Sequence, residues 1–371
     1  MLELNQLLHH VVEQRASDLH LKAGGRPYVR IDGHLRETDF DVLGPADTER
    51  IAAAILDPVR AEEFARAGEV DVAYGAGAPG GAEGAGRFRV NVFRQRGSVA
   101  LVLRRILPGT PNFDALGLPE TVRRLSEEPR GLVLVTGPAG SGKTTTVAAM
   151  IDQINETQPK HIVTIEDPIE VLHRDKRSIV NQREIGSDTA GYRTALERVL
   201  RQDPDVIFIG ELRDRETVAA ALAAAGTGHL VLSTLHTMNA TESVIRLIDF
   251  FPAHQQPQVR GALAGSLRGV VSQQLLERVD GKGRIPAVEI LVSTARVSDK
   301  ILNPEETASL EDTIADGEYY GMQTFDQSLF GLYKNGLVGL RDAFAAASHP
   351  HDLRISLQQA GLPVGALDSM R

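Results

Sequence analysis

Cysteine is absent from this 371-residue sequence, which excludes disulfide bonds and zinc sites with cysteine ligands. No apolar run approaches the roughly 18 residues of a membrane-spanning helix, and the first residues lack the basic-then-apolar pattern of a secretory signal. Positive charge is scarce too, because 40 Lys and Arg stand against 49 Asp and Glu, a net charge of −9. A net negative charge argues against a protein that binds nucleic acid of any base sequence through its charge alone. These absences predict a cytoplasmic protein without a transmembrane segment, which reaches the inner face of the membrane only through a protein partner.

The apolar content of 42% is ample for buried cores, and the length predicts more than one domain. Residues 1–106 combine a helix-like leucine spacing near the start with alternating segments such as RFRVNVF at 87–93. This pattern predicts a small α+β domain with an antiparallel sheet. Residues 107–119 contain three prolines and two glycines, which indicates an interdomain linker. The Gly- and Ala-rich stretch at 75–86 is interpreted as a mobile hairpin tip.

From residue 120 onward, short apolar runs alternate with helical segments, the pattern of an α/β domain with parallel strands. This domain is expected to extend to residue 347, mostly helical after Val259 with one further candidate strand at 286–291. Residues 348–371 are expected to form a weakly ordered tail. The expected strands are 132–136, 162–165, 206–209 and 229–233, and the expected helices include 191–200 and 215–225.

The stretch GPAGSGKTT at 137–145 lies between an apolar run and a helix-like segment. It fits the phosphate-binding pattern G-x-x-x-x-G-K-[ST] at every fixed position. Glycines let backbone N–H groups surround a phosphate, the lysine reaches the β- and γ-phosphates, and the threonine hydroxyl can hold Mg²⁺. The chain is therefore predicted to bind ATP with Mg²⁺. The candidate nucleotide-binding residues are Gly137, Pro138, Ala139, Gly140, Ser141, Gly142, Lys143, Thr144 and Thr145.

Carboxylates follow two of the expected strands. Glu166, Asp167 and Glu170 belong to TIEDPIE, where one of them is a candidate general base for the attacking water. The alternative is a solvated acidic turn. Glu211 follows the strand at 206–209 in the position of a Walker B carboxylate, where it would act on Mg²⁺ through water or on the nucleophile. Its alternative is an exposed loop glutamate.

Two histidines, His229 and His236, bracket the fourth expected strand and are candidates for sensing the γ-phosphate. A structural hydrogen-bonding role is the alternative for each, and no ligand cluster that would indicate a metal site accompanies them. Phosphoryl transfer also gains from a cation supplied by the same or a neighbouring subunit. The candidate arginines are Arg87, Arg89, Arg94, Arg96, Arg104 and Arg105 near the end of the first domain, and Arg213 and Arg246 in the second.

The four motifs GPAGSGKTT, TIEDPIE, DPDVIFIGELRDRET and TGHLVLSTLHTMNA occur in one order and spacing. Together they resemble the Walker A, Asp box, Walker B and His box of the secretion ATPase superfamily, which serves type II secretion and type IV pilus assembly and retraction. ASDLHLKAGGRPYVRIDG and GMQTFDQSL extend the resemblance over nearly the whole chain. It implies a PAS-like N-terminal domain, a RecA-like motor domain with a helical C-terminal region, and a homohexameric ring that acts on an inner-membrane platform protein of the pilus.

Within this superfamily the sequence is most similar to the twitching-motility retraction ATPases of the PilT type. It starts its SDLHL segment by residue 17, and it lacks the four-cysteine element that many assembly ATPases carry. One segment departs from the retraction pattern, since ARVSDKILN at 295–303 keeps little of the motif AIRNLIRE. The alternatives are therefore an accessory PilU-type paralogue that works with other pilus ATPases, or an assembly or type II secretion ATPase. More distant alternatives are a nucleic-acid translocase and a non-hydrolysing nucleotide switch.

Overall fold

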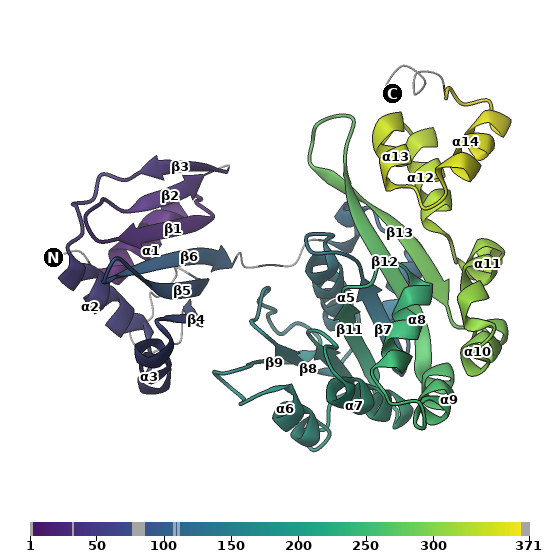
Figure 1. Cartoon of the computed structure of the whole chain (residues 1–371), viewed down its shortest axis with the longest axis horizontal. Helices are drawn as coiled ribbons and strands as arrows, with labels where there is room; N and C mark the ends of the chain where they lie inside the picture. Colours follow the sequence, from purple (N-terminus) through teal and green to yellow (C-terminus); the bar gives the residue numbers. More distant parts are fainter. Residues whose placement is uncertain (1–2, 32, 76–85, 107–108, 110–111, 365–371) are drawn as a thin grey trace. The chain divides into compact units, whose positions relative to one another are not determined.

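The computed structural model describes residues 3–31, 33–75, 86–106, 109 and 112–364. The chain forms two compact units, which are drawn in Figure 1 and described separately here. The first comprises 1–109 with 170–172, and the second comprises 110–169 with 173–371. Among the described residues, none of the helices combines the length and hydrophobicity needed to cross a bilayer. Most of the Gly/Ala stretch interpreted as a hairpin tip, 76–85, lies outside the described residues.

The first unit is built around an antiparallel sheet of six strands in the order β3-β2-β1-β6-β5-β4. Successive side chains of a strand point to opposite faces of its sheet, so every second residue of β5 faces the helices. Phe88, Val90 and Val92 do so and are buried. The opposite face carries charge, and the buried carboxylate of Asp18 accepts a 2.8 Å hydrogen bond from Nε of Arg104 on the neighbouring strand. The elements are α1 (Leu4–Glu13), β1 (Asp18–Lys22), β2 (Tyr28–Ile31), β3 (His34–Glu37), α2 (Pro45–Ile55), α3 (Pro58–Ala67), β4 (Glu69–Gly75), β5 (Arg87–Gln95) and β6 (Ser98–Ile106).

The second unit contains a seven-stranded sheet in the order β13-β12-β7-β11-β10-β8-β9. All neighbouring strands run parallel except the β12–β13 pair. The central strands are buried along their whole length, as continuous apolar runs such as LVLV and VIFI predict. The strands are β7 (Gly131–Thr136), β8 (His161–Glu166), β9 (Ile179–Glu184), β10 (Val206–Ile209), β11 (Leu230–Leu235), β12 (Leu267–Glu277) and β13 (Arg284–Val292).

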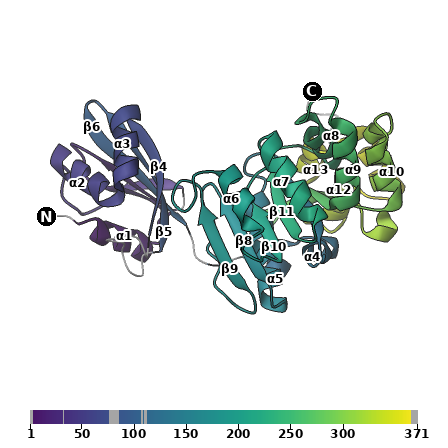
Figure 2. The same ribbon diagram turned by 90° about the horizontal axis from the view of Figure 1, so that it is seen from below.

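Two apolar layers sandwich this sheet. Helix α5, together with η1 and α4, covers one face and buries side chains such as Met150 and Val122. Helices α6 to α11 supply the core of the other face, with side chains such as Leu196, Leu222 and Leu263; Figure 2 shows α7 and α9 beside this sheet. The helices are η1 (Phe113–Leu116), α4 (Glu120–Ser126), α5 (Lys143–Thr157), α6 (Tyr192–Val199), α7 (Arg215–Gly226), α8 (Ala240–Asp249), α9 (Gln256–Ser266), α10 (Ala295–Leu302), η2 (Thr307–Ser309) and α11 (Leu310–Ala315).

The C-terminal part differs from the sequence-based expectation in two places. The segment 267–277, which lies in the region expected to be mostly helical, is strand β12, because it pairs with β7 and completes the buried sheet. The expectation of a weakly ordered tail is wrong for 350–359, which form helix α14. Leu353 and Leu357 of this helix are buried in a core shared with α12 and α13. The remaining elements are η3 (Glu318–Tyr320), α12 (Phe325–Lys334), α13 (Leu340–Ala346) and α14 (Pro350–Gln359), and residues 365–371 lie outside the described part.

Candidate active site

The glycine-rich loop lies between the end of β7 and the start of α5, at the carboxyl edge of the parallel strands. Gly137 and Gly142 have φ of 142° and 92°, a region that side chains rarely allow. A Cβ on Gly137 would lie 2.3 Å from the Gln273 carbonyl oxygen, and one on Gly142 would lie 2.6 Å from Gln273 Nε2. Glycine is therefore required at both positions, by backbone conformation and by close packing.

Gln273 of β12 braces this loop from the neighbouring strand. Its Nε2 donates a 2.7 Å hydrogen bond to the Ser141 carbonyl, and its Oε1 accepts a 2.8 Å bond from the Thr146 hydroxyl. The side chain is buried. The sequence-based expectation does not include this residue, because it treats the region after Val259 as mostly helical. The signal in the sequence is the polar run Ser272, Gln273 and Gln274 between the apolar pairs VV and LL.

Lys143 opens helix α5, and its side chain is buried beneath the loop. The ammonium Nζ donates to the carbonyl oxygens of Gly137 and Pro138 at 2.8 and 2.9 Å. It also lies 3.4 Å from Nδ1 of His236. Folding of the loop thus places a fixed positive charge where the sequence pattern requires one for phosphate.

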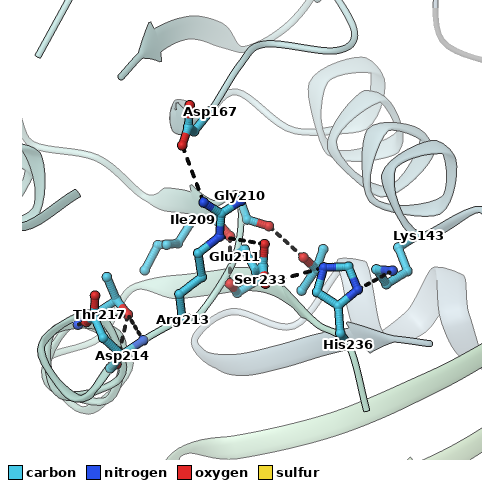
Figure 3. A network of polar contacts seen from close by, with 11 residues as sticks. Lys143, Asp167, Ile209, Gly210, Glu211, Arg213, Asp214, Thr217, Ser233 and His236 are labelled. Atoms are coloured by element: carbon cyan, nitrogen blue, oxygen red, sulfur yellow. Dashed lines mark hydrogen bonds and ion pairs between the residues drawn. The ribbon is translucent and has the colours of Figure 1, made fainter. Parts of the chain in front are cut away.

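A row of side chains continues from Lys143 along the carboxyl ends of the neighbouring strands (Figure 3). His236, which follows β11, has Nε2 at 3.3 Å from Glu211 Oε1, beyond the end of β10. Glu211 Oε2 accepts a 2.7 Å hydrogen bond from Nε of Arg213, whose Nη1 lies 3.4 Å from Asp167 at the end of β8. The hydrogen bond to Glu211 raises the pKa of Arg213 above its ordinary value, and partial burial, which lowers it, offsets only part of this increase.

The other acidic candidates differ in environment. Glu166 is buried at the end of β8, where its Oε1 accepts hydrogen bonds from the Thr164 hydroxyl at 2.6 Å and from Gln182 at 3.1 Å. Glu170 is exposed and lies beyond the strand end. Tyr192 of α6 packs against Gly210, since a Cβ on that glycine would lie 2.9 Å from the tyrosine oxygen. Burial, with added repulsion from Asp167, raises the pKa of Tyr192 and keeps the ring neutral.

Three predicted residues lie apart from this row. His229 precedes β11, and its carbonyl accepts a hydrogen bond from the Gly131 N–H at the start of β7. It is thus at the amino edge of the sheet, a strand length of about 20 Å from the carboxyl edge. His229 therefore lies far from the phosphate loop of its own subunit, and its role as a sensor of the γ-phosphate stays a prediction. Arg246 lies late in α8, 4.9 Å from the centre of the Phe250 ring, and Arg104 belongs to the first unit, paired with Asp18.

The loop fits a bound nucleotide on structural grounds. The loop leads directly into the N-terminus of α5, where the first N–H groups and the dipole of a helix favour an anion. The buried hydroxyl of Ser141 is also without a hydrogen-bond partner among the described residues. No group of three or more His, Asp or Glu that could hold a metal ion by protein ligands alone occurs in the described part of the chain.

Comparison with known proteins agrees with this geometry. The model of the type II/IV secretion system protein family matches residues 2–320. The type IV pilus retraction ATPase PilT of Pseudomonas aeruginosa is 41% identical, over 95% of this chain and 100% of its own length. The type IV pilus ATPase PilU of the same organism is 40% identical, over 96% of this chain and 92% of its own.

Solved structures show the same relationship. A crystal structure of the pilus retraction motor PilT with bound ADP superposes with a TM-score of 0.86 at 44% identity, and covers 96% of this chain and 100% of that chain. The ATPase DotB of Legionella pneumophila superposes with a TM-score of 0.81 at 25% identity, over 97% of this chain and 95% of its own. The predicted fold class, a small α+β domain followed by a P-loop ATPase domain, is confirmed.

Proposed function

Because this chain belongs to the type II/IV secretion system ATPase family, we propose that it is a motor ATPase that drives retraction of a type IV pilus. The observation that carries the proposal is the contact of Lys143, His236 and Glu211 at the ends of three adjacent strands. A fixed cation, a titratable ring and a carboxylate thereby meet beside a phosphate-binding loop. This arrangement suits phosphoryl transfer to water, in which catalysis consists of positioning and charge stabilisation.

The residues of this edge take the following roles. Lys143 and the loop amides bind the phosphates of ATP, while Thr144 and Glu211 offer the oxygen ligands that suit Mg²⁺. The bound ion would neutralise charge on the phosphate oxygens. Water attacks the γ-phosphorus, and the bond between this phosphorus and the oxygen that leaves with ADP breaks. A carboxylate accepts the proton that the water loses. The candidate bases are Glu166, Glu170 and Glu211. His236, between Lys143 and Glu211, responds to the presence of the γ-phosphate.

Work on a pilus requires an assembly larger than one chain. We propose a homohexameric ring in which ATP bound by one subunit is completed by a cation from a neighbour, with Arg104 and Arg246 as candidates for that cation. His229 is remote from the loop of its own subunit, and we group it with Arg104 and Arg246 as a candidate for contacting the nucleotide of a neighbouring subunit. The ring acts on an inner-membrane platform protein of the pilus from the cytoplasmic side. A conformational change on ATP binding, reversed after hydrolysis, would supply the displacement.

ATP turnover of purified wild type beside Lys143→Ala and Glu211→Gln, with the solution mass of each, tests this proposal. We expect a ring that hydrolyses ATP, loss of nucleotide binding in Lys143→Ala, and retained binding with turnover at least 100-fold lower in Glu211→Gln, by analogy with loss of a charge-stabilising group. A wild-type rate no higher than that of Lys143→Ala would overturn the motor assignment and favour a regulatory nucleotide switch.

An accessory role of the PilU type is the second candidate. The divergent segment 295–303 favours it, and the identity to PilU, 40%, is nearly the same as the 41% to PilT. Expression in Pseudomonas aeruginosa strains that lack PilT or PilU separates the two roles. Rescue of twitching in the strain without PilT supports the retraction motor, whereas rescue only in the strain without PilU supports the accessory role.

A further inference from the structure

A buried set of hydroxyl groups connects the strand of the phosphate loop to helix α8. Thr136 ends β7 immediately before Gly137, and its hydroxyl donates a 2.9 Å hydrogen bond to Ser272 of β12. It also lies 3.4 Å from the hydroxyl of Ser243 in the first turns of α8. Ser243 contacts the Thr237 hydroxyl at 2.6 Å. Since Thr237 directly follows His236, this set ties the histidine loop to the base of the phosphate loop.

Glu289 of β13 lies at the edge of this set. It pairs across the strands with Ser272, which in turn pairs with Thr136. Its side chain is buried, and its Oε1 accepts a 2.7 Å hydrogen bond from the Ala240 N–H, the first helical residue of α8. A carboxylate at this position satisfies an otherwise unpaired N–H and complements the positive end of the helix dipole. Glu289 therefore fixes where α8 begins, only four residues after His236.

We infer that Glu289 is a positioning residue for ATP hydrolysis: by holding the first turn of α8 it keeps His236 against Glu211 and Lys143. This inference rests on the proposed function. Asn239, the N-cap of α8, fixes only the helix end itself, because its side chain accepts from the Glu242 N–H. Glu289 reaches α8 from the sheet that carries the phosphate loop. It thus ties the histidine loop to the same framework as Lys143.

The charge on Glu289 sets how firmly it holds the helix. Burial raises the pKa of its carboxyl to about 7, against the lowering effect of the Ala240 N–H, and the charges of Glu311 and Asp326 add to the increase. Glu311 belongs to α11 and Asp326 to α12, and both lie 3.5 Å from His349 Nδ1. From α8 itself, the Glu242 carboxylate accepts the Met238 N–H. Below neutral pH the protonated carboxyl is a weaker acceptor, so the helix start and His236 are held less firmly.

Steady-state ATP turnover across pH, measured on the full-length ring, tests this inference. The variants are Glu289→Gln, Glu289→Ala, His236→Ala and the double variant with Glu289→Gln and His236→Ala. Glu277→Gln, an exposed glutamate of the adjacent strand, is the matched control. Hydrogen exchange of the peptide spanning 236–243 is the second measurement, because it reports the helix start independently of turnover.

At alkaline pH we expect kcat of Glu289→Gln to be several-fold lower than that of wild type, with KM for ATP within about twofold. In wild type, kcat should fall as pH decreases through neutral, because Glu289 becomes protonated. Glu289→Gln should not show this fall. Exchange at 236–243 should be faster in Glu289→Gln and Glu289→Ala, and unchanged in Glu277→Gln. In the His236→Ala background the Glu289 change should add nothing to the loss of kcat, because it acts through His236.

Two results would overturn the inference while leaving the proposed function intact: a pH profile of Glu289→Gln that parallels wild type, or losses that multiply in the double variant. The double variant and the exchange measurement keep the test decisive even where Glu289→Ala fails to fold. A wild-type rate no higher than that of Lys143→Ala would overturn the proposed function, and the inference with it.

Discussion

Gln273 donates its side-chain amide to the Ser141 carbonyl at 2.7 Å, and so joins strand β12 to the loop that is to hold phosphate. The same side chain accepts from Thr146 on the first turn of α5. Gln273 therefore holds both the end of the loop, at Ser141, and the first turn of the helix that follows, at Thr146. The strand that carries Gln273 lies more than a hundred residues later in the chain.

Gln273→Ala should weaken nucleotide binding by up to about thirtyfold, because the loop loses two hydrogen bonds worth roughly 1 kcal/mol each. Titration of a fluorescent ADP analogue measures the dissociation constant. Gln274→Ala, on the same strand but half-buried, is the matched control and should bind as wild type does. Equal affinity of the two variants would show that the loop holds its shape without Gln273.

Gly142→Ala should abolish nucleotide binding and lower the melting temperature, since φ of 92° disfavours any side chain and the new Cβ would lie 2.6 Å from Gln273 Nε2. Gly261→Ala is the matched control. It lies in helix α9 with nothing within 4 Å of the new Cβ, so it should stabilise the protein by about 0.5–1 kcal/mol. Thermal unfolding with and without ADP measures both effects. A Gly142→Ala variant that ADP still stabilises would contradict the loop geometry.

Glu289 should make stability depend on pH in a defined direction. Its pKa in the folded protein, about 7, exceeds the ordinary 4.5, so the folded state binds the proton more tightly. The resulting stabilisation is full below about pH 4.5 and is lost as pH rises through about 7. The Gln side chain in Glu289→Gln cannot ionise. As pH rises across this window, the free energy of unfolding of the variant should therefore increase relative to that of wild type by about 3 kcal/mol. Urea denaturation at several pH values measures the difference, and parallel curves for wild type and Glu289→Gln would contradict it.

Leu357→Ala should destabilise the C-terminal helices by about 2–5 kcal/mol, the cost of a cavity at a fully buried leucine. Ile355→Ala, on the same helix but 39% exposed, should cost far less. Limited proteolysis of the two variants reports the local stability of α14. Equal cleavage rates for both would mean that α14 contributes little to the packed core of α12 and α13.

Local sequence was sufficient for the phosphate loop and for the central strands. Their runs are apolar throughout, and the strand, glycine loop and helix follow one another within a short stretch. The convergence of Lys143, Glu211 and His236 also follows from sequence, because parallel strands place their carboxyl ends at one edge. His229 begins its strand instead of ending it, so the same rule places it at the opposite edge of the sheet.

Features that depend on distant partners were not predictable in the same way. Strand β12 mixes Gly269, Ser272 and Gln273 with apolar residues, and it is extended because β7 and β13 pair with it on either side. Helix α14 has only Leu353 and Leu357 to bury, and its proline occupies the first helical turn, where proline is tolerated. The role of Glu289 depends on α8, nearly fifty residues earlier in the chain.

The row from Lys143 through His236, Glu211 and Arg213 to Asp167 follows four successive strands, with one member after each of β7, β11 and β8 and two after β10. Strands lie about 4.8 Å apart, so the row spans roughly 14 Å of the sheet edge. Each contact joins two side chains on the same or on neighbouring strands, and the order along the row is cation, imidazole ring, carboxylate, cation, carboxylate. Removing the side chain of an interior member such as Glu211 would therefore interrupt the run of direct contacts, and a phosphate gained or lost beside Lys143 would act on Asp167 only through the weaker electrostatic field at longer range.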